Sequence, residues 1–287
     1  MKTTNAKRAI LSAGVVTAIM LASSASATTL SVSITNEQPA DGVFLTPLAS
    51  VFHDGSFDLF DAGDNLTQRQ ADAAGTFDAQ AAAAVEGLAE GGAAGLIVDA
   101  ATAAGAQAGV VFGTSAFGSV DGQPPLIDPS ETATALIDVN YGTDDDVFFS
   151  FFSMILPTND AFIGNDNATA YQVVTDGVFQ SSTISVYTND AWDAGTEANN
   201  FVGLPFSPNG GTGATDTPDG IVAQFGDLVF IDGAVRGAGF GAVGPDGLSA
   251  GTLLATIQIA AVPVPAGLPL LAGGLGLLGL AKRRRKA

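Results

Sequence analysis

The feature that most constrains the fold is a run of apolar residues in the middle of the chain. Residues 147–156 read VFFSFFSMIL, and Pro157 follows directly. A nearly continuous apolar run of this length, bounded by a proline, predicts a strand whose two faces are both buried. The protein therefore needs packed layers on both sides of this strand.

Other segments alternate polar and apolar residues, as strands with one exposed face do. In residues 132–140, Ala133, Ala135, Ile137 and Val139 fall on one face. The remaining predicted strands are 29–35, 171–174, 183–187, 221–231 and 253–259. Clusters of Gly, Asn, Asp and Pro separate them, which predicts an antiparallel β-sandwich.

One short helix is predicted over residues 79–90, which are rich in alanine and are followed by Gly91 and Gly92. Residues 93–119 are too biased toward Gly and Ala to assign. Residues 199–219 form a long loop without a predicted element.

The N-terminal segment, residues 1–27, has the three parts of a secretory signal peptide. Lys2, Lys7 and Arg8 precede an apolar stretch of 13 residues, and Ala25-Ser26-Ala27 follows. The apolar stretch is shorter than the ~20 residues that span a membrane. We expect export, with cleavage between Ala27 and Thr28.

The C-terminal segment, residues 262–287, combines a short proline motif, an apolar stretch over 267–281 and a basic cluster over 282–286. The motif consists of Val262, Pro263, Val264, Pro265 and Ala266. In this order the three parts resemble the VPLPA variant of bacterial PEP-CTERM sorting signals, with Val264 in place of Leu. The resemblance implies an exosortase-type processing enzyme as a partner and a transient membrane anchor, whose basic end stays cytoplasmic. A permanent short anchor is the open alternative, because apolar length alone does not separate the two.

The body between the signals, residues 28–261, is strongly acidic. It contains all 29 Asp and Glu residues but only Arg69 and Arg236 as basic residues, a net charge near −27. Such a chain offers no basic surface to nucleic acid, and it concentrates divalent cations around itself. The chain has no cysteine and a single histidine, His53, which excludes disulfides and multi-histidine metal sites.

Two acidic loops are candidates for holding a cation. Asp160 follows the buried strand, and a later loop places Asp193 and Glu197 four residues apart with Gly195 between them. Carboxylates from separate loops are typical Ca²⁺ ligands. Aspartate is equally common in turns, where it caps backbone N–H groups, so the residues alone leave both interpretations open.

A family resemblance favours the cation. Residues 152–164 (FSMILPTNDAFIG) resemble the SFxSMIxPSPDWFVG motif of the spondin N-terminal domain, and residues 192–197 (WDAGTE) match its WDAGTD signature except at the end. Residues 47–63 and 88–92 (LAEGG) resemble the family's first half, in the same order. The resemblance covers roughly residues 29–201.

This resemblance implies a C2-like β-sandwich that binds one Ca²⁺ and acts in matrix or cell-surface recognition. Carried over by position, the ligands are Asp160, Asp193 and Glu197, completed by a backbone carbonyl within 190–192. Glu197 replaces an aspartate, which lengthens that ligand. Ala161 replaces the tryptophan that follows the aspartate, so contacts through that aromatic are in doubt.

We therefore expect an exported cell-surface or matrix protein that recognises an extracellular protein or polysaccharide. It would contact no nucleic acid, and would meet the membrane only through its C-terminal segment. Trp192 and His53 are expected to be structural, and the acids of 144–146 and 165–167 to form solvated turns. A Ser-His-Asp hydrolase would need the lone histidine, His53, to sit beside a nucleophile, and we expect no enzyme. A metal-free matrix or biofilm scaffold is the alternative, and a secreted enzyme is the third.

Overall fold

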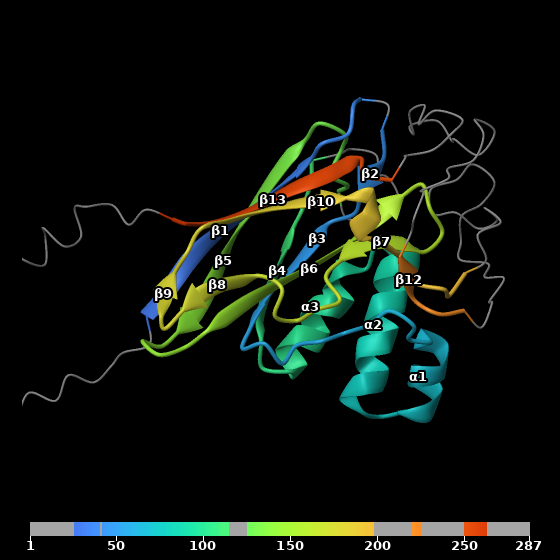
Figure 1. Ribbon diagram of the computed structural model, residues 1–287, viewed down its shortest axis with the longest axis horizontal. Coiled ribbons are helices and arrows are strands. Elements are labelled where there is room, and N and C mark those ends of the chain that lie inside the picture. Colours follow the sequence, from blue (N-terminus) through green and yellow to red (C-terminus); the bar gives the residue numbers. More distant parts are fainter. Residues whose placement is uncertain (1–25, 41, 115–124, 198–219, 225–249, 263–287) are drawn as a thin grey trace, which may run out of the picture.

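Two antiparallel sheets and three helices form the part of the protein that the computed structural model describes (Figure 1). The described residues are 26–40, 42–114, 125–197, 220–224 and 250–262. Among them no helix is long and apolar enough to cross a membrane. Most of the predicted signal peptide, and the sorting motif beyond Val262, lie outside these residues.

The first sheet has the strand order β10-β13-β1-β5. Its members are β1 (Ser26–Asn36), β5 (Thr132–Tyr141), β10 (Ser182–Tyr187) and β13 (Leu253–Ala261). Apolar residues alternate along each strand and face inward, such as Leu30, Val32 and Ile34 of β1. Ala133, Ile137 and Val139 of β5 are buried as predicted, while Ala135 is partly buried.

The second sheet has the order β12-β11-β7-β6-β3-β4, with β2, β8 and β9 attached at its margins. Its members are β2 (Phe44–Leu45), β3 (Leu48–His53), β4 (Gln107–Val111), β6 (Val147–Leu156), β7 (Ala161–Gly164), β8 (Gln172–Thr175), β9 (Val178–Phe179), β11 (Ala191–Asp193) and β12 (Ala223–Gln224). The two sheets share one apolar core, so the mainly β, antiparallel prediction is confirmed.

Helices cover the outer face of the second sheet, which explains the apolar run of β6. Phe149 and Phe151 point into the core between the sheets, whereas Phe152 belongs to a second core with the helices. On α2 (Phe77–Gly91), Val85 and Leu88 are fully buried in this second core. The strand is therefore buried on both faces, as predicted, and it ends at Pro157, which follows a cis peptide bond.

The prediction of one short helix is wrong, because the described residues already form three helices. The expected helix is α2, whereas α1 (Leu66–Asp72) and α3 (Ala94–Ala103) were not predicted. The first is short and polar, and begins where Asn65 accepts a hydrogen bond from Gln68 N. The buried side of α3 is mostly alanine, which packs closely against the sheet but gives little hydrophobic contrast along the sequence. β4, in the same unassigned stretch, was also missed.

One side chain links the two sheets where β4 runs beside β5. Gln107 Nε2 donates to the backbone carbonyl of Asn140 at 3.0 Å, and Asn140 N donates to Gln107 Oε1 at 2.6 Å. The amide thus occupies both backbone groups of Asn140 on the free edge of β5, in the way a neighbouring strand would.

The sandwich has two ends, which we call the site pole and the terminal pole. The site pole consists of the turn 157–160 and the loop 193–197, beyond the end of β6. The terminal pole consists of the start of β1, the end of β13 and the turn 142–146, which precedes β6. Since a ten-residue strand extends ~33 Å, the poles lie roughly 30 Å apart. In Figure 1 β1 begins and β13 ends at the left, whereas β7 and β12 lie at the right.

Candidate functional site

The two acidic loops meet at the site pole because the strands beside them pair. β7 begins directly after Asp160 and runs antiparallel to β11, with Ala161 opposite Asp193. Ala194 N then donates to the carbonyl of Asp160 at 3.1 Å. The structure thus brings together all three carboxylates that the sequence singled out.

Asp160 lies at the centre of this arrangement and is 0 % exposed. Its Oδ2 accepts hydrogen bonds from the backbone N–H groups of Thr196 and Glu197, each at 3.0 Å. Its Oδ1 is buried and has no hydrogen-bond partner. Burial, followed by the charge of Asp193, raises the pKa of Asp160 to about 7. A buried carboxylate oxygen without a partner is costly unless a cation or a proton reaches it.

Glu90 is a further acidic residue at this site that the sequence analysis did not name as a ligand. It lies near the C-terminal end of α2, and its Oε1 is also buried without a hydrogen-bond partner. Burial raises the pKa of Glu197 to about 7, and the charge of Glu90 adds to the effect. The pKa of Glu90 is itself raised by burial. Its sequence signal was its place in LAEGG, one of the four segments that carry the family resemblance.

The loop after β11 owes its shape to Asp193 and Gly195. Asp193 Oδ1 accepts a hydrogen bond from Gly195 N at 2.7 Å, which closes a tight turn. Gly195 has φ +68°, and a Cβ there would lie 2.6 Å from the backbone N and O of Ile221. Only glycine fits this position, since both the backbone conformation and the close approach exclude a side chain.

Trp192 anchors the start of the loop, as predicted. Its side chain is 3 % exposed, and its Nε1 donates to the carbonyl of Gly164 at 2.9 Å. Phe60 meets the indole edge-on, with ring centroids 5.2 Å apart. The indole is a packing residue, and it fixes the position from which Asp193 leaves β11.

The donor set has the chemistry of a hard-cation site, although it is not arranged as one. Ca²⁺ takes six to eight oxygen ligands, and here two buried carboxylate oxygens, from Asp160 and Glu90, have no hydrogen-bond partner. Within the described ranges, however, no three His, Asp or Glu side chains lie close enough to hold an ion as they stand. The residues supply the oxygen donors that a hard cation needs, but not in the arrangement of a formed site.

The carbonyl expected from residues 190–192 stays a prediction. Ala191 and Trp192 belong to β11, which pairs with β7. Asp190 is exposed, and its Oδ2 accepts a hydrogen bond from Tyr187 N at 2.8 Å, which closes the 3₁₀ turn Thr188–Asp190. The carboxylate of Asp190 therefore serves this turn.

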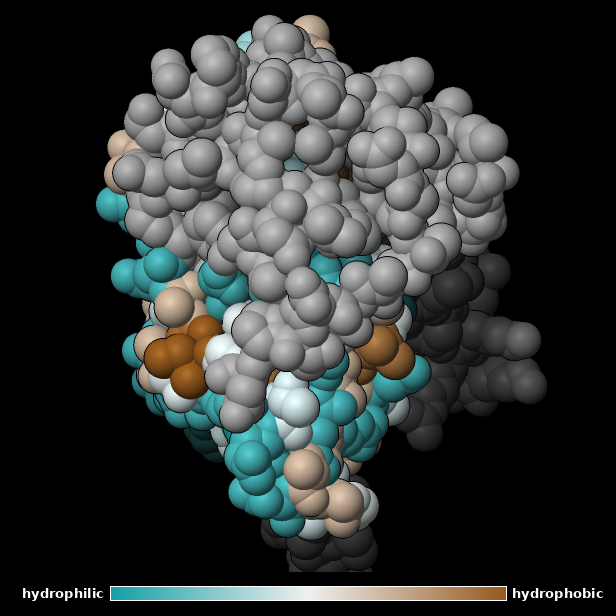
Figure 2. Space-filling model, turned by 90° about the vertical axis from the view of Figure 1, so that its right-hand side faces the viewer, coloured by the Kyte–Doolittle hydropathy of each residue, from teal (hydrophilic) through white to brown (hydrophobic). Residues whose placement is uncertain are grey.

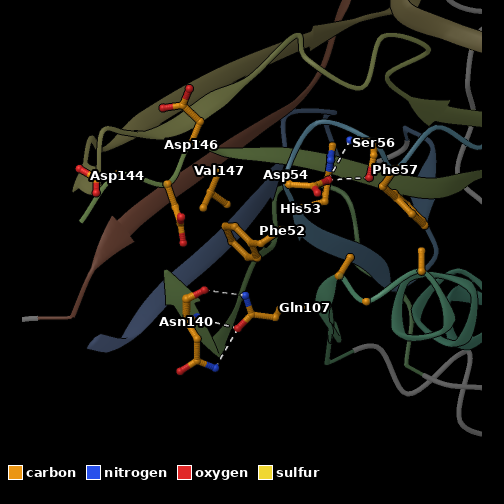
Figure 3. Close-up of a pocket in the computed structure, with 14 residues that line it drawn as sticks. Phe52, His53, Asp54, Ser56, Phe57, Gln107, Asn140, Asp144, Asp146 and Val147 are labelled. Carbon is orange, nitrogen blue, oxygen red and sulfur yellow. Dashed lines mark hydrogen bonds between the residues drawn. The ribbon is translucent and has the colours of Figure 1, made fainter. Parts of the chain in front are cut away.

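A cavity of about 400 Å³ lies at the terminal pole, beside His53 (Figure 3). His53 Nδ1 accepts a hydrogen bond from Gly55 N at 3.1 Å, so Nε2 carries the proton and donates to Ser150 Oγ at 2.9 Å. Burial lowers the pKa of His53 to about 4, although the charge of Asp54 opposes this. With both ring nitrogens engaged, the imidazole makes the kind of structural hydrogen bonds that the sequence analysis expected.

The acids near this cavity hold turns, as predicted. Asp145 Oδ2 accepts a hydrogen bond from Gly142 N at 2.6 Å, and Asp146 Oδ1 accepts one from Asp176 N at 3.0 Å. In the neighbouring loop, Asn165 Oδ1 accepts a hydrogen bond from Phe151 N at 3.1 Å. These side chains shape the backbone around the cavity.

The site-pole side of the molecule, shown in Figure 2, is mainly hydrophilic over its described surface, with small, separate apolar spots. Comparisons of the chain with protein-family models, curated proteins and solved structures gave no match. The resemblance to the spondin domain therefore stays a prediction that rests on the quoted motifs.

Proposed function

We propose that this is an exported cell-surface or extracellular-matrix protein whose spondin-type sandwich binds one Ca²⁺ for adhesion or matrix interaction. Asp160, Asp193 and Glu197 would hold the ion, and Glu90 would join them. The observation that carries the proposal is the fully buried Asp160 carboxylate, whose Oδ1 lacks a hydrogen-bond partner beside other acids. Bound Ca²⁺ supplies the positive charge that this cluster lacks, and it would fix the two loops relative to each other.

The charge of the protein limits its partners. Arg69, the one basic side chain among the described residues of the acidic body, is already paired with Asp64 and Asp78. Nucleic acid is thus a poor partner, and an extracellular protein or polysaccharide fits better. The quoted terminal segments support export, sorting by an exosortase-type enzyme and contact with the membrane only through the C-terminal segment.

Titration calorimetry of the exported, metal-stripped protein with Ca²⁺ tests the proposal. We expect one saturable site that survives moderate salt. It should be lost in Asp193→Asn but kept in the matched control Asp99→Asn, which removes the same charge from an exposed position on α3. Asp160→Asn should also lose the site, and circular dichroism would verify that each variant is folded.

Weak, salt-suppressed binding that is equal in all these variants would contradict a specific site. It would favour the alternative, a metal-free matrix or biofilm scaffold. That alternative is compatible with the described side chains, which form no ready-made metal group. Turnover of a polysaccharide or peptide would revive the third candidate, a secreted enzyme.

A further inference from the structure

The expected signal peptide and the expected C-terminal sorting segment adjoin the sandwich on neighbouring strands. The expected cleavage site, Ala27–Thr28, lies in β1, where Ala27 pairs with Asn140. β13 ends beside it, and Val262 N donates to the carbonyl of Thr29 at 3.1 Å. Both connections therefore start at the terminal pole, on neighbouring strands (Figure 1).

The spacing between the sandwich and the C-terminal apolar segment is short. β13 ends at Ala261, and the apolar stretch begins at Gly267, so residues 262–266 make the whole connection. Five fully extended residues reach at most about 18 Å. Whether the apolar segment is kept or is cut near the motif, an attached chain holds its terminal pole near the attachment point.

The terminal pole is acidic, which disfavours close contact with an anionic surface. Its cavity is lined by Asp54, Asp144, Asp145 and Asp146, and no lysine or arginine is among the lining residues. A membrane surface that carries anionic lipids would repel such a pole within a Debye length of about 10 Å at 0.1 M salt. The repulsion favours a domain that stands away from the surface on its tether.

From this geometry we propose that the attached protein stands on its terminal pole, with the site pole, in which Asp160, Asp193 and Glu197 lie, facing away roughly 30 Å beyond the attachment side. The inference rests on the proposed surface attachment. It identifies the partner's location: a molecule that uses the cation site approaches from outside the cell, on another cell or in the surrounding matrix. The membrane that carries the protein would lie at the opposite pole.

Single-cysteine labelling on intact cells tests the orientation, because the natural chain contains no cysteine and gives no background. Glu37→Cys places a thiol at the site pole, on an exposed residue directly after β1. Val178→Cys places one at the terminal pole, where Val178 is 63 % exposed beside Gly177, which donates to the carbonyl of Asp145. The probe is a bulky polyethylene-glycol maleimide.

We expect the thiol at position 37 to react several-fold faster than that at 178 on cells, and the two rates to match after detergent solubilisation. Equal or reversed rates on cells would overturn the orientation. Recovery of the chain in the medium alone would instead overturn the attachment. Adding Asp160→Asn to both variants should leave the labelling ratio unchanged, so loss of the cation site is distinguished from loss of orientation.

Discussion

The two poles of the sandwich are both rich in aspartate, yet they treat these residues differently. At the terminal pole, Asp145 and Asp146 stay exposed and each accepts a hydrogen bond from a backbone N–H. At the site pole, Asp160 and Glu197 are buried, and Asp160 keeps an oxygen without a partner. The difference teaches that burial and missing partners, rather than the number of acids, distinguish a candidate cation site from a solvated turn.

The largest effect that separates the poles should come from Trp192→Ala. Loss of a buried aromatic side chain typically costs about 3–5 kcal/mol of unfolding free energy. Because the indole positions the start of the 193–197 loop, we expect Ca²⁺ affinity to fall as well. Denaturant unfolding and calorimetry would measure the two losses.

Phe57→Ala is the matched change at the terminal pole. Phe57 is 2 % exposed and packs against His53, with ring centroids 5.7 Å apart. A comparable loss of stability with unchanged Ca²⁺ affinity is expected. If both variants lost Ca²⁺ binding equally, the site pole would not depend on Trp192 in particular, and the distinction between the poles would fail.

The second prediction concerns pH, since the poles should respond in opposite directions. Asp160 and Glu197 have folded pKa values of about 7, above the ordinary carboxyl values, so the unfolded chain releases its protons first as pH rises. Stability of the metal-free protein should therefore decline from about pH 4 and level off above about pH 7. Each pKa unit corresponds to about 1.4 kcal/mol, so a decline of a few kcal/mol is expected.

His53 acts with the opposite sign. Its folded pKa of about 4 lies below the ordinary value of 6.5, so stability is lost as pH falls from 6.5 toward 4. Unfolding free energies measured in chelator from pH 4 to 8 would separate the two effects. Asp160→Asn should flatten the decline toward high pH, and His53→Gln should flatten the loss toward low pH. The same pH profile in both variants would refute this assignment.

The smallest expected effect compares two glycines with left-handed backbone. Gly195→Ala adds a methyl group 2.6 Å from the Ile221 backbone, whereas Gly75→Ala, at φ +83°, meets nothing within 4 Å. Both substitutions should lower the free energy of unfolding by about 1 kcal/mol because of the unfavourable φ. Only Gly195→Ala should lower it by about a further 1–2 kcal/mol and weaken Ca²⁺ binding. Thermal unfolding of the two variants measures the difference, and equal losses would mean that the loop yields to the methyl group.

The strand content was readable from the sequence because periodicity reports burial directly. The unbroken run of β6 required cover on both faces, and the alternation in β5 required cover on one. The sequence did not reveal which elements cover these faces. Alanine-rich α3 and polar α1 give weak helical patterns, so the helical layer was largely missed.

The candidate site was predictable in part for a similar reason. Asp160, Asp193 and Glu197 stand in loops with recognisable motifs, and strand pairing brought them together. Glu90 comes from a helix about seventy residues earlier in the chain, and its LAEGG segment does not by itself indicate that it lies beside them. The burial that leaves Asp160 Oδ1 without a partner depends on the packed fold, which spacing along the chain cannot report.

The link between Gln107 and Asn140 bears on how the edge of β5 is protected from pairing with another chain. A free strand edge offers unpaired backbone groups to any neighbouring chain, which is the usual start of sheet-to-sheet aggregation. The Gln107 amide takes up both backbone groups of Asn140 on the exposed edge of β5. Gln107 thus blocks these two backbone groups. Another copy of the chain cannot form sheet hydrogen bonds with β5 at that position and extend the sheet into a fibre.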